Sequence, residues 1–502
     1  MRRTLRSRAR IVAGLPALWR EAGRPLAPRP PGPDRLDLAL PPPADGALTR
    51  LEREVHAGTG YLRSGFLVLR ANAEALRWRM ALADAAVRSL DLQYYVWWAD
   101  RSGTALLARA RAAADRGVRV RLLLDDLTTV LADASTPVVR DAAFAALAAH
   151  PNIAVRLFNC WHSRSRLGRL LELLARTDQL NHRMHNKVLV ADNRAAVLGG
   201  RNIGDEYFGR SEDFNFLDLD VLGIGPVARQ ASAVFDMYWN SDLVVPPEAL
   251  GIVPGPAGAA TPAAPAGPAP APLAGLPALL PGASVVYGDA PDPDGSAQHV
   301  SRAVREMIGR AQREVLIVNA YVIPDAAFVG SLRALVARGV RVRLLTNSLA
   351  SHDVPAVNSH YKPWRKPLLE AGVELFELRA DAALKAELVD APPDSAAFIG
   401  LHSKAVVIDR NRVFVGSMNL DPRSRRLNTE MGTVIYGERI AAAVAADIEL
   451  ATRPENAWAV TLDGSGRLRW TSSAGVRRLQ PARSLWQRVQ DVVFMAFSKE
   501  LY

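Results

Sequence analysis

The sequence predicts an α/β protein in which one layered domain occurs twice. The string RGVRVRLL occurs word for word at 116–123 and again at 338–345. A second pair of similar segments follows at a similar interval: HNKVLVADNRAAVLGGRN at 185–202 and HSKAVVIDRNRVFVGSMN at 402–419. In both halves, apolar runs with strand character alternate with helical stretches, which is typical of a sheet covered by helices. We therefore expect two duplicated α/β/α sandwich domains related by a pseudo-twofold axis.

Residues 1–60 are expected to form a basic N-terminal arm. Residues 1–35 hold nine arginines against Glu21 and Asp34, so they carry +7 of the net charge of +11. The weak charge of the remainder argues against a protein body that binds nucleic acid through a broad cationic face. It favours an arm that rests on anionic lipid headgroups, with a disordered arginine tail as the alternative.

The apolar run IVAGLPALW at 11–19 resembles a signal sequence only superficially. It is nine residues long, contains Pro16 and has no small-residue cleavage site after it. We expect no cleaved signal, and an interfacial segment anchored by Trp19 is the functional alternative. The chain has no run of about 18 apolar residues, so no membrane-spanning helix is expected.

The first repeat is expected at 61–245 and the second at 283–450. Each begins with a helical stretch, continues with an apolar strand, a helix that ends at Arg-Gly and a second strand, and then reaches its histidine motif. The expected strands are SLDLQYYVWW at 89–98 and VRVRLLLDD at 118–126 in the first repeat, and EVLIVNAYVI at 314–323 and VRVRLLTNS at 340–348 in the second.

Segments of different character separate and follow the repeats. Residues 246–282 are so rich in Pro, Ala and Gly that we expect an extended linker. Within 451–502, AWAVTLDGSGRLRWTS at 457–472 alternates apolar and polar residues around a turn, which predicts a β-hairpin. The apolar tail RVQDVVFMAFSKELY at 488–502 is expected to pack as a core helix, with a membrane-surface contact as the alternative.

Two lysines stand at matching places in a chain that prefers arginine. Only six of the 62 basic residues are lysine, and two of these follow a histidine at the same spacing, as His185 with Lys187 and His402 with Lys404. On a strand, residues two apart project from the same face. Each pair should therefore lie on one face, beside matched downstream Gly and Asn residues.

These residue types suit phosphoryl chemistry. A lysine ammonium can neutralise nonbridging phosphate oxygens while an imidazole attacks phosphorus or moves a proton. A phosphodiester displacement through a covalent intermediate needs two histidines, and the duplication supplies them if both motifs face one shared active-site cleft. Neutral donors that could bind the substrate phosphate follow the motifs: Asn202, Ser417 and Asn419.

Simpler roles fit some residues within and beside the motifs. Asp192 and Asp409 fall at the turn after each expected strand, where an aspartate commonly bonds its own backbone. His182 and His185 have a spacing that could suggest metal binding, but no partner ligands accompany them, so no metal is expected. The single cysteine, Cys160, excludes an internal disulfide framework and is expected to be a small buried residue.

The paired motifs resemble the phospholipase D superfamily signature H-x-K-(x)4-D, which is present twice. Wider similarity, from about residue 62 to the C-terminus, is greatest to bacterial cardiolipin synthases of the C type. The resemblance implies a phospholipase D-like fold and an enzyme without metal or cofactor that forms a phosphohistidine. His185 would be the nucleophile and His402 the general acid/base. The candidate catalytic set is the two motifs together: His185, Lys187, Asp192, His402, Lys404 and Asp409.

The resemblance also implies a carboxylate after each motif that orients the opposing imidazole. Glu430 matches that place in the second repeat. Aligning Gly225 with Gly437 places Asp218 at the equivalent position of the first repeat, with Asp220 as the near alternative. Lys187, Lys404, Asn202 and Asn419 would bind phosphate.

For the reaction, the resemblance implies a phosphatidyltransferase that joins a phosphatidyl group to phosphatidylglycerol. The donor would be phosphatidylglycerol or phosphatidylethanolamine, and water as acceptor would give phosphatidic acid instead. A nuclease or a non-catalytic lipid-binding scaffold is less favoured. We expect a peripheral protein of the bacterial cytoplasmic membrane with phospholipid substrates and no nucleic-acid partner, while the need for an accessory protein stays open.

Overall fold

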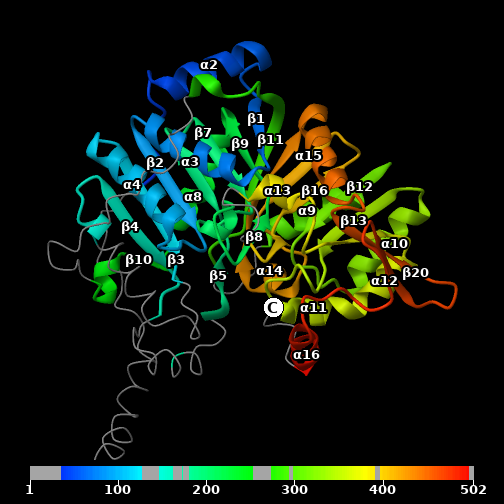
Figure 1. The fold of residues 1–502 in the computed structure, drawn as a ribbon. Coiled ribbons are helices and arrows are strands. Elements are labelled where there is room, and N and C mark those ends of the chain that lie inside the picture. The colour runs from blue at the N-terminus through cyan, green and yellow to red at the C-terminus, as the bar shows by residue number, and fades with distance from the viewer. Residues whose placement is uncertain are drawn as a thin grey trace, which may run out of the picture.

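The computed structural model contains two α/β halves that lie side by side (Figure 1). It describes residues 36–126, 146–161, 172, 180–252, 273–292, 298–389 and 396–496. Residues 1–35, which include Trp19, lie outside the described residues, and so do 253–272 of the expected linker and 497–502 of the apolar tail.

The first half is a sheet with parallel strands at one side and antiparallel strands at the other. β2, β3 and β4 are parallel, and the remaining neighbours are antiparallel. In neighbour order the strands are β10 (Val244–Val245), β4 (Ile153–Phe158), β3 (Arg119–Asp125), β2 (Ser89–Tyr94), β6 (Val188–Ala191), β7 (Ala195–Gly199), β9 (Asp220–Ile224) and β1 (Ser64–Leu69).

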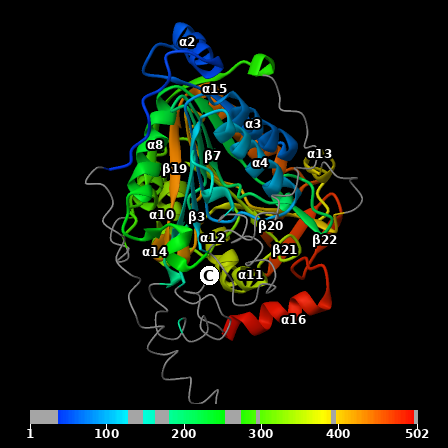
Figure 2. The ribbon, with the colours of Figure 1, turned by 90° about the vertical axis from the view of Figure 1, so that its left-hand side faces the viewer.

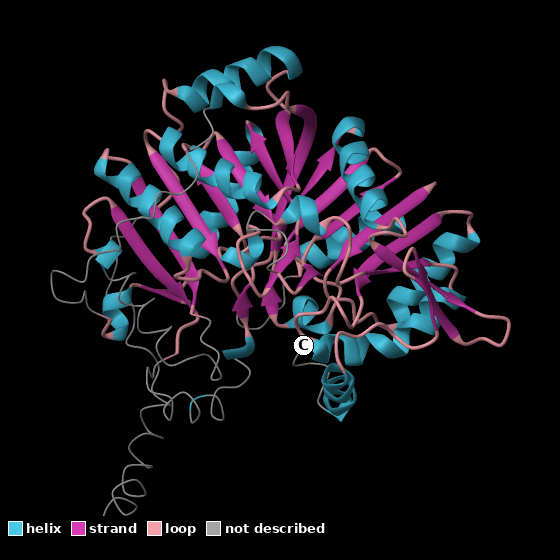
Figure 3. Ribbon diagram, in the orientation of Figure 1, coloured by secondary structure: helices cyan, strands magenta, loops and turns pink. Residues whose placement is uncertain are grey.

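The second half repeats this order strand for strand. Its strands are β20 (Ala457–Leu462), β14 (Glu374–Leu378), β13 (Arg341–Asn347), β12 (Glu314–Asn319), β16 (Lys404–Ile408), β17 (Arg412–Gly416), β19 (Met431–Tyr436) and β11 (Leu280–Gly288). The halves join where β1 and β11 pair antiparallel, with Gly65 opposite Pro281. The matching strand order confirms the predicted duplicated α/β fold (Figure 3).

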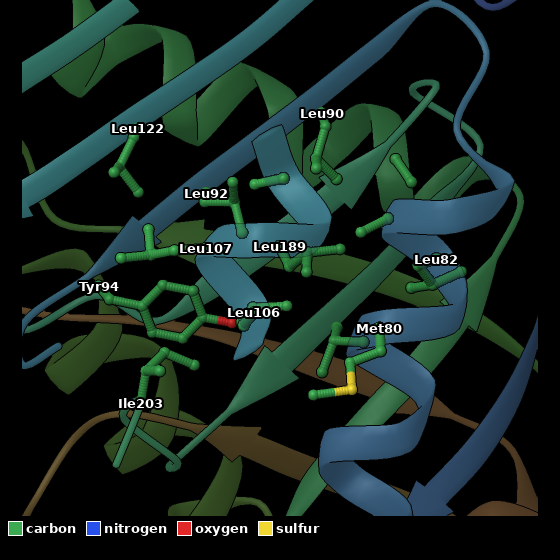
Figure 4. Close-up of a cluster of buried hydrophobic side chains, with 14 of the residues drawn as sticks. Met80, Leu82, Leu90, Leu92, Tyr94, Leu106, Leu107, Leu122, Leu189 and Ile203 are labelled. Atoms are coloured by element: carbon green, nitrogen blue, oxygen red, sulfur yellow. The ribbon is translucent and has the colours of Figure 1, made fainter. Parts of the chain in front are cut away.

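Alternation along the strands places helices on both faces of each sheet. Leu122 of β3 belongs to the core beneath α3 (Asn72–Ala85) and α4 (Arg101–Asp115), whereas the next residue, Leu123, packs on the opposite face with α8 (Pro226–Trp239). Figure 2 shows α3 and α4 on one side of the strands and α8 on the other. In Figure 4, Leu90, Leu92 and Leu189 of the sheet face Leu106 and Met80 of the helices.

The second half has the same layers. α9 (His299–Gly309), α10 (Ala326–Ala337) and α12 (Arg365–Glu370) cover one face, and α15 (Glu438–Ala451) covers the other. The core under α8 is continuous with the core under α15, so the two halves share one apolar interior. Hydrogen bonds cross the same boundary, since the side chain of Gln230 on α8 donates to the carbonyl of Ser284 on β11 at 2.9 Å.

The expected arm at 1–60 is wrong in its second part. α2 (Ala47–Thr59) packs on the first half and buries Leu48 and Val55, because its apolar residues recur at helical spacing. Its buried Glu52 forms ion pairs with Arg194 and Arg229. The described residues 36–59 are therefore part of the folded body.

The expected linker at 246–282 also contains regular structure at its ends. A 3₁₀ turn, η2 (Pro247–Leu250), follows the first half, and η3 (Leu273–Gly275) precedes β11. Residues 280–282 already pair with β1 as the first part of β11. The sequence did not predict this part of the strand, because Pro281 and its neighbours have the composition of a linker. Pro281 instead pairs with Gly65, where the two halves meet.

The predicted hairpin forms, but the described part of the apolar tail, 488–496, does not pack as a core helix. β20 and β21 (Leu468–Ser472) pair about the turn, and β22 (Gly475–Arg477) extends the sheet. α16 (Leu485–Val493) follows on the surface with its apolar side chains exposed, because its polar residues make the contacts to the body. Among the described residues, no helix has both the length and the apolar character needed to cross a bilayer.

Candidate active site

Two small parallel pairings between the halves position the catalytic candidates. β5 (Arg183–Met184) pairs with β18 (Asn428–Thr429), with Met184 opposite Thr429. β8 (Phe214–Leu217) pairs with β15 (Phe398–Leu401), with Leu217 opposite Leu401. The residues that follow each pairing therefore meet across the interface, as His185 with Glu430 and His402 with Asp218.

Each imidazole contacts a carboxylate of the other half through its Nδ1 atom. His185 Nδ1 lies 2.8 Å from Glu430 Oε2, and His402 Nδ1 lies 2.6 Å from Asp218 Oδ2. Because Nδ1 is engaged, Nε2 is the nitrogen that can reach a substrate. Asp220, the alternative to Asp218, instead accepts hydrogen bonds from Arg79 at 2.8 Å and Arg201 at 3.2 Å.

Backbone contacts fix the two histidines outside the large sheet. The amide of His185 donates to the carbonyl of Thr429 at 2.9 Å, and the amide of His402 donates to that of Leu217 at 2.8 Å. The expectation that each histidine shares one strand with its lysine is therefore wrong, since β6 and β16 begin only after the histidine. The chain leaves the large sheet at these points because it pairs with the other half.

The two motif lysines are buried beside their histidines. Lys187 Nζ donates to the carbonyl of His185 at 2.6 Å, and Lys404 Nζ donates to the carbonyl of His402. Burial lowers the pKa of Lys187 to about 7 and that of Lys404 to about 8, even though nearby carboxylates oppose the change. The small ammonium groups can therefore bind an anion while their own charge is poorly solvated.

The histidines and lysines of the two motifs act on one another's pKa values, so the two motifs form one site. Burial lowers the pKa of His185 well below its usual value, and the charges of Lys187, Lys404 and His402 lower it further. Burial and Lys404 also lower the pKa of His402, although Asp218 opposes them. An anionic phosphate group would stabilise the protonated forms of the two lysines, so the site favours such a ligand.

The two orienting carboxylates differ in charge. Burial raises the pKa of Glu430 to about 7, despite the opposing charge of Lys187. Burial also acts to raise the pKa of Asp218, but His402 and Lys404 outweigh it and hold the pKa well below its usual value. Asp218 is therefore ionised at neutral pH, whereas Glu430 titrates near it.

Asp192 and Asp409 lie at hairpin turns and bind backbone amides. Asp192 accepts hydrogen bonds from the amides of Val87, Arg88 and Ser89 at 2.8–3.1 Å. Asp409 accepts from the equivalent amides of 312–314 at 2.7–3.3 Å. These contacts agree with the turn role expected from their spacing and make both aspartates positioning residues.

The three candidate phosphate ligands have different surroundings. Both ends of the Asn202 amide are used within the protein, because Oδ1 accepts from the Val96 amide at 3.2 Å and Nδ2 donates to the Tyr207 hydroxyl at 2.9 Å. Ser417 donates to Glu430 Oε2 at 2.5 Å. Asn419 is buried with its Oδ1 unpaired among the described residues. Its Oδ1 can therefore accept a hydrogen bond that the described residues do not supply.

Aromatic residues outside the motifs, which the sequence did not single out, enclose both histidines. Tyr95 packs edge-on against His185 with ring centroids 4.9 Å apart, and Tyr207 packs similarly on His402 at 5.1 Å. Tyr321 lies 6.4 Å from His402, and its hydroxyl donates to Asp353 at 2.7 Å. Tyr95 and Tyr321 follow the carboxyl ends of β2 and β12, where side chains of a sheet with parallel strands commonly form a site. Their position after these strands is the feature of the sequence from which the two tyrosines could have been predicted.

Comparison with known proteins identifies relatives over most of the chain. Residues 80–239 and 304–450 match the family described as cardiolipin synthase, PLD-like domain. The chain is 36% identical over 451 residues to cardiolipin synthase C of Escherichia coli, covering 85% of this chain and 93% of that protein. It is 25% identical over 416 residues to a cardiolipin synthase of Geobacillus kaustophilus, covering 82% and 70% of the two chains.

A solved structure has the same fold. Phosphatidylserine synthase of Haemophilus influenzae superposes with a TM-score of 0.55 and 14% sequence identity, covering 80% of this chain and 90% of that one. At this identity the match concerns the arrangement of the two halves and their sheets.

Proposed function

Because the chain belongs to the cardiolipin synthase family of phospholipase D-like proteins, we propose that it makes cardiolipin by transferring a phosphatidyl group to phosphatidylglycerol. The chain is a phosphatidyltransferase of the phospholipase D type. The donor is phosphatidylglycerol or phosphatidylethanolamine, and the protein acts as a peripheral protein at the bacterial cytoplasmic membrane.

One observation carries the proposed mechanism: each half lends a carboxylate to the histidine of the other. The contacts of 2.8 Å at His185 and 2.6 Å at His402 hold the Nδ1 atoms in place. Two oriented imidazoles in one site, with a lysine beside each, are what a displacement through a covalent intermediate requires.

In the first half-reaction, His185 Nε2 attacks the phosphorus of the donor lipid. An N–P bond forms and the bond from phosphorus to the headgroup alcohol breaks. His402 in its protonated form gives its Nε2 proton to the leaving oxygen, so glycerol or ethanolamine departs neutral at that oxygen. Lys187 and Lys404 neutralise the nonbridging oxygens, and Asn419 donates to them through its Nδ2 group.

In the second half-reaction, His402 is neutral and works as a base. Its Nε2 takes the proton of the terminal hydroxyl of phosphatidylglycerol as that oxygen attacks the phosphohistidine. The N–P bond breaks, cardiolipin leaves and His185 returns to its starting state. Both histidines then have the protonation with which the cycle began.

The unequal carboxylates support this division of labour. Ionised Asp218 favours the protonated form of His402, which is the form a general acid needs. Glu430 titrates near pH 7, so it gives the protonated form of His185 little support. The pKa of His185 lies well below its usual value, so His185 stays neutral with a free Nε2 lone pair. A nucleophile needs that form.

The lipid products test the proposed function directly. Purified protein is incubated with phosphatidylglycerol vesicles, with and without phosphatidylethanolamine, and the lipids are separated. Cardiolipin is the expected product, and phosphatidic acid as the sole product would contradict the proposal. The single variants His185→Ala and His402→Ala are each expected to lower turnover by about 10³-fold or more, because residues of one catalytic unit fail together.

A further inference from the structure

Helix α16 presents its apolar face to solvent. Leu485 is 78% exposed, Trp486 66% and Val492 61%, and Val489 and Val493 are also exposed. These positions recur at intervals that place them on one side of a helix. In Figures 1 and 2, α16 projects from the lower side of the molecule beside α11 (Pro355–Tyr361).

The opposite face of α16 holds the helix to the body through polar contacts. Asp491 is only 1% exposed, and its carboxylate accepts hydrogen bonds from Asn358 at 2.6 Å and Gln480 at 2.7 Å. Gln487, one turn earlier, donates to the carbonyl of Leu349 at 2.5 Å. An ordinary surface helix turns its apolar face to the protein, whereas α16 turns its polar face to the protein. These contacts hold the apolar face toward solvent.

Positive charge accompanies the apolar face. Residues 477–490 contain four arginines and no acidic residue, and Asp491 is buried and paired. Arg477 and Arg478 are exposed beside the apolar Leu479, which precedes Gln480 and its contact with α16. Apolar side chains with a tryptophan, bordered by arginines, match the boundary between headgroups and acyl chains of an anionic bilayer.

α16 is connected to the active site by a short series of contacts. Arg483, just before the helix, donates to the carbonyl of Ala350 at 2.7 Å and to that of His352 at 3.3 Å. The ring of His352 stacks on Tyr321 with centroids 5.4 Å apart. Tyr321 in turn packs against His402. The surface formed by α16 is therefore linked by direct contacts to the residues that surround His402.

We propose that α16 is an interfacial helix that docks the enzyme on anionic lipid bilayers and brings their headgroups to the active site. The apolar residues enter the bilayer surface while the arginines contact lipid phosphates. The inference rests on the proposed function for its substrate, and it concerns how the enzyme reaches that substrate.

The test uses the full chain and two matched double variants. Trp486→Ser with Val492→Ser removes apolar surface from α16. Leu62→Ser with Val87→Ser removes similarly exposed apolar side chains elsewhere on the surface. Binding is measured by co-sedimentation with vesicles of phosphatidylglycerol and phosphatidylcholine, and turnover is measured on these vesicles and on monomeric short-chain phosphatidylglycerol.

The α16 variant is expected to lose at least about 10-fold in vesicle binding and in turnover on vesicles, with turnover of the monomeric lipid unchanged. The Leu62/Val87 variant should match the wild type in all three. Vesicle binding by the α16 variant equal to that of the wild type would overturn the inference. So would a change in oligomeric state on gel filtration with vesicle binding unchanged, which would assign the face to a second copy.

A separate readout distinguishes this inference from the proposed function. Bilayers that contain brominated lipid are expected to quench the Trp486 emission, so Trp486→Phe should lose part of the quenching while it still binds. Wild-type protein that binds vesicles with this quenching but turns over neither form of phosphatidylglycerol would contradict the proposed function and leave the docking intact. Turnover of both forms of phosphatidylglycerol without quenching would contradict the docking and leave the proposed function intact.

Discussion

At the scale of single residues, the ionised state of Asp218 is the strongest chemical asymmetry of the site. Its carboxylate contacts His402, whose proposed role as general acid depends on holding a proton. Glu430, with a pKa of about 7, gives His185 less negative charge. Two motifs that match in sequence therefore produce two histidines in different electrostatic settings, and the difference comes from the carboxylates.

Asp218→Asn is expected to lower kcat by roughly 10²-fold and to move the alkaline limb of kcat to lower pH. The reason is that loss of the anion lowers the pKa of His402, so the imidazolium is depleted at a lower pH. Glu430→Gln is the matched control, and its smaller effect on kcat should come without that shift. A pH profile of kcat that is identical in wild type and Asp218→Asn would contradict the assignment.

The lysines predict a second pH dependence. Lys187 and Lys404, with pKa values of about 7 and 8, must gain protons to bind an anion above pH 8. The dissociation constant of sulfate, whose charge is constant in this range, should therefore rise by roughly 500-fold between pH 7 and 9, about 50-fold from Lys187 and about 10-fold from Lys404. Calorimetry should show proton uptake on binding, and Lys187→Arg should weaken the pH dependence. A dissociation constant that is the same at both pH values would contradict this account.

At the scale of elements, the hairpin turn after β6 is bound to the start of β2, and the turn after β16 is bound to the start of β12. Asp192 and Asn193 have left-handed φ angles of 54° and 55°, and the Asp192 carboxylate reaches the amides of 87–89 at the beginning of β2. The position of the aspartate in the motif thus follows from the length of the strand that follows the lysine.

Asp192→Ala is expected to lower the free energy of unfolding by about 3 kcal/mol, because it removes the acceptor of three backbone amides, of which that of Ser89 is buried. Asp192→Asn should lose less, since its side-chain oxygen still accepts. Urea denaturation gives the free energy, and kcat of the folded fraction should stay near the wild-type value. Abolished turnover at wild-type stability would show a chemical role for Asp192 instead.

Elements with local signals could be predicted from sequence, and elements defined by distant partners could not. The strands around Leu122 and Leu344 follow from apolar runs and from the exact repeat of their sequence. β5 and β18 are two residues long, and their pairing depends on a partner 245 residues away, which no local pattern encodes. The same holds for α16, whose apolar pattern predicts a helix but not which face meets the body.

At the scale of the whole molecule, neither half contains a complete site. Residues up to 252 supply His185 and Asp218, and residues from 273 supply His402 and Glu430, so each histidine depends on the other half for its carboxylate. The sequence predicted the shared site from the duplication of the motifs. The alignment of the two repeats favoured Asp218 over Asp220, but nothing in the sequence excluded Asp220, whose carboxylate accepts hydrogen bonds from two arginines.

Separated halves are expected to restore activity only together. Co-expressed fragments 1–259 and 260–502 should co-purify, because β1–β11 pairing and the shared core hold them, and the complex should make cardiolipin. Each fragment alone should be inactive. Glu430→Gln in the second fragment should impair the complex as it impairs the intact chain. An active single fragment would contradict the shared site.

The antiparallel contact between β1 and β11 has the form of an interface between two equal partners of a symmetric dimer. Because the halves belong to one chain, their association is an intramolecular event that dilution does not weaken. The intact enzyme should therefore keep its specific activity on dilution, whereas the two-fragment enzyme should lose activity once its concentration falls below the dissociation constant of the halves.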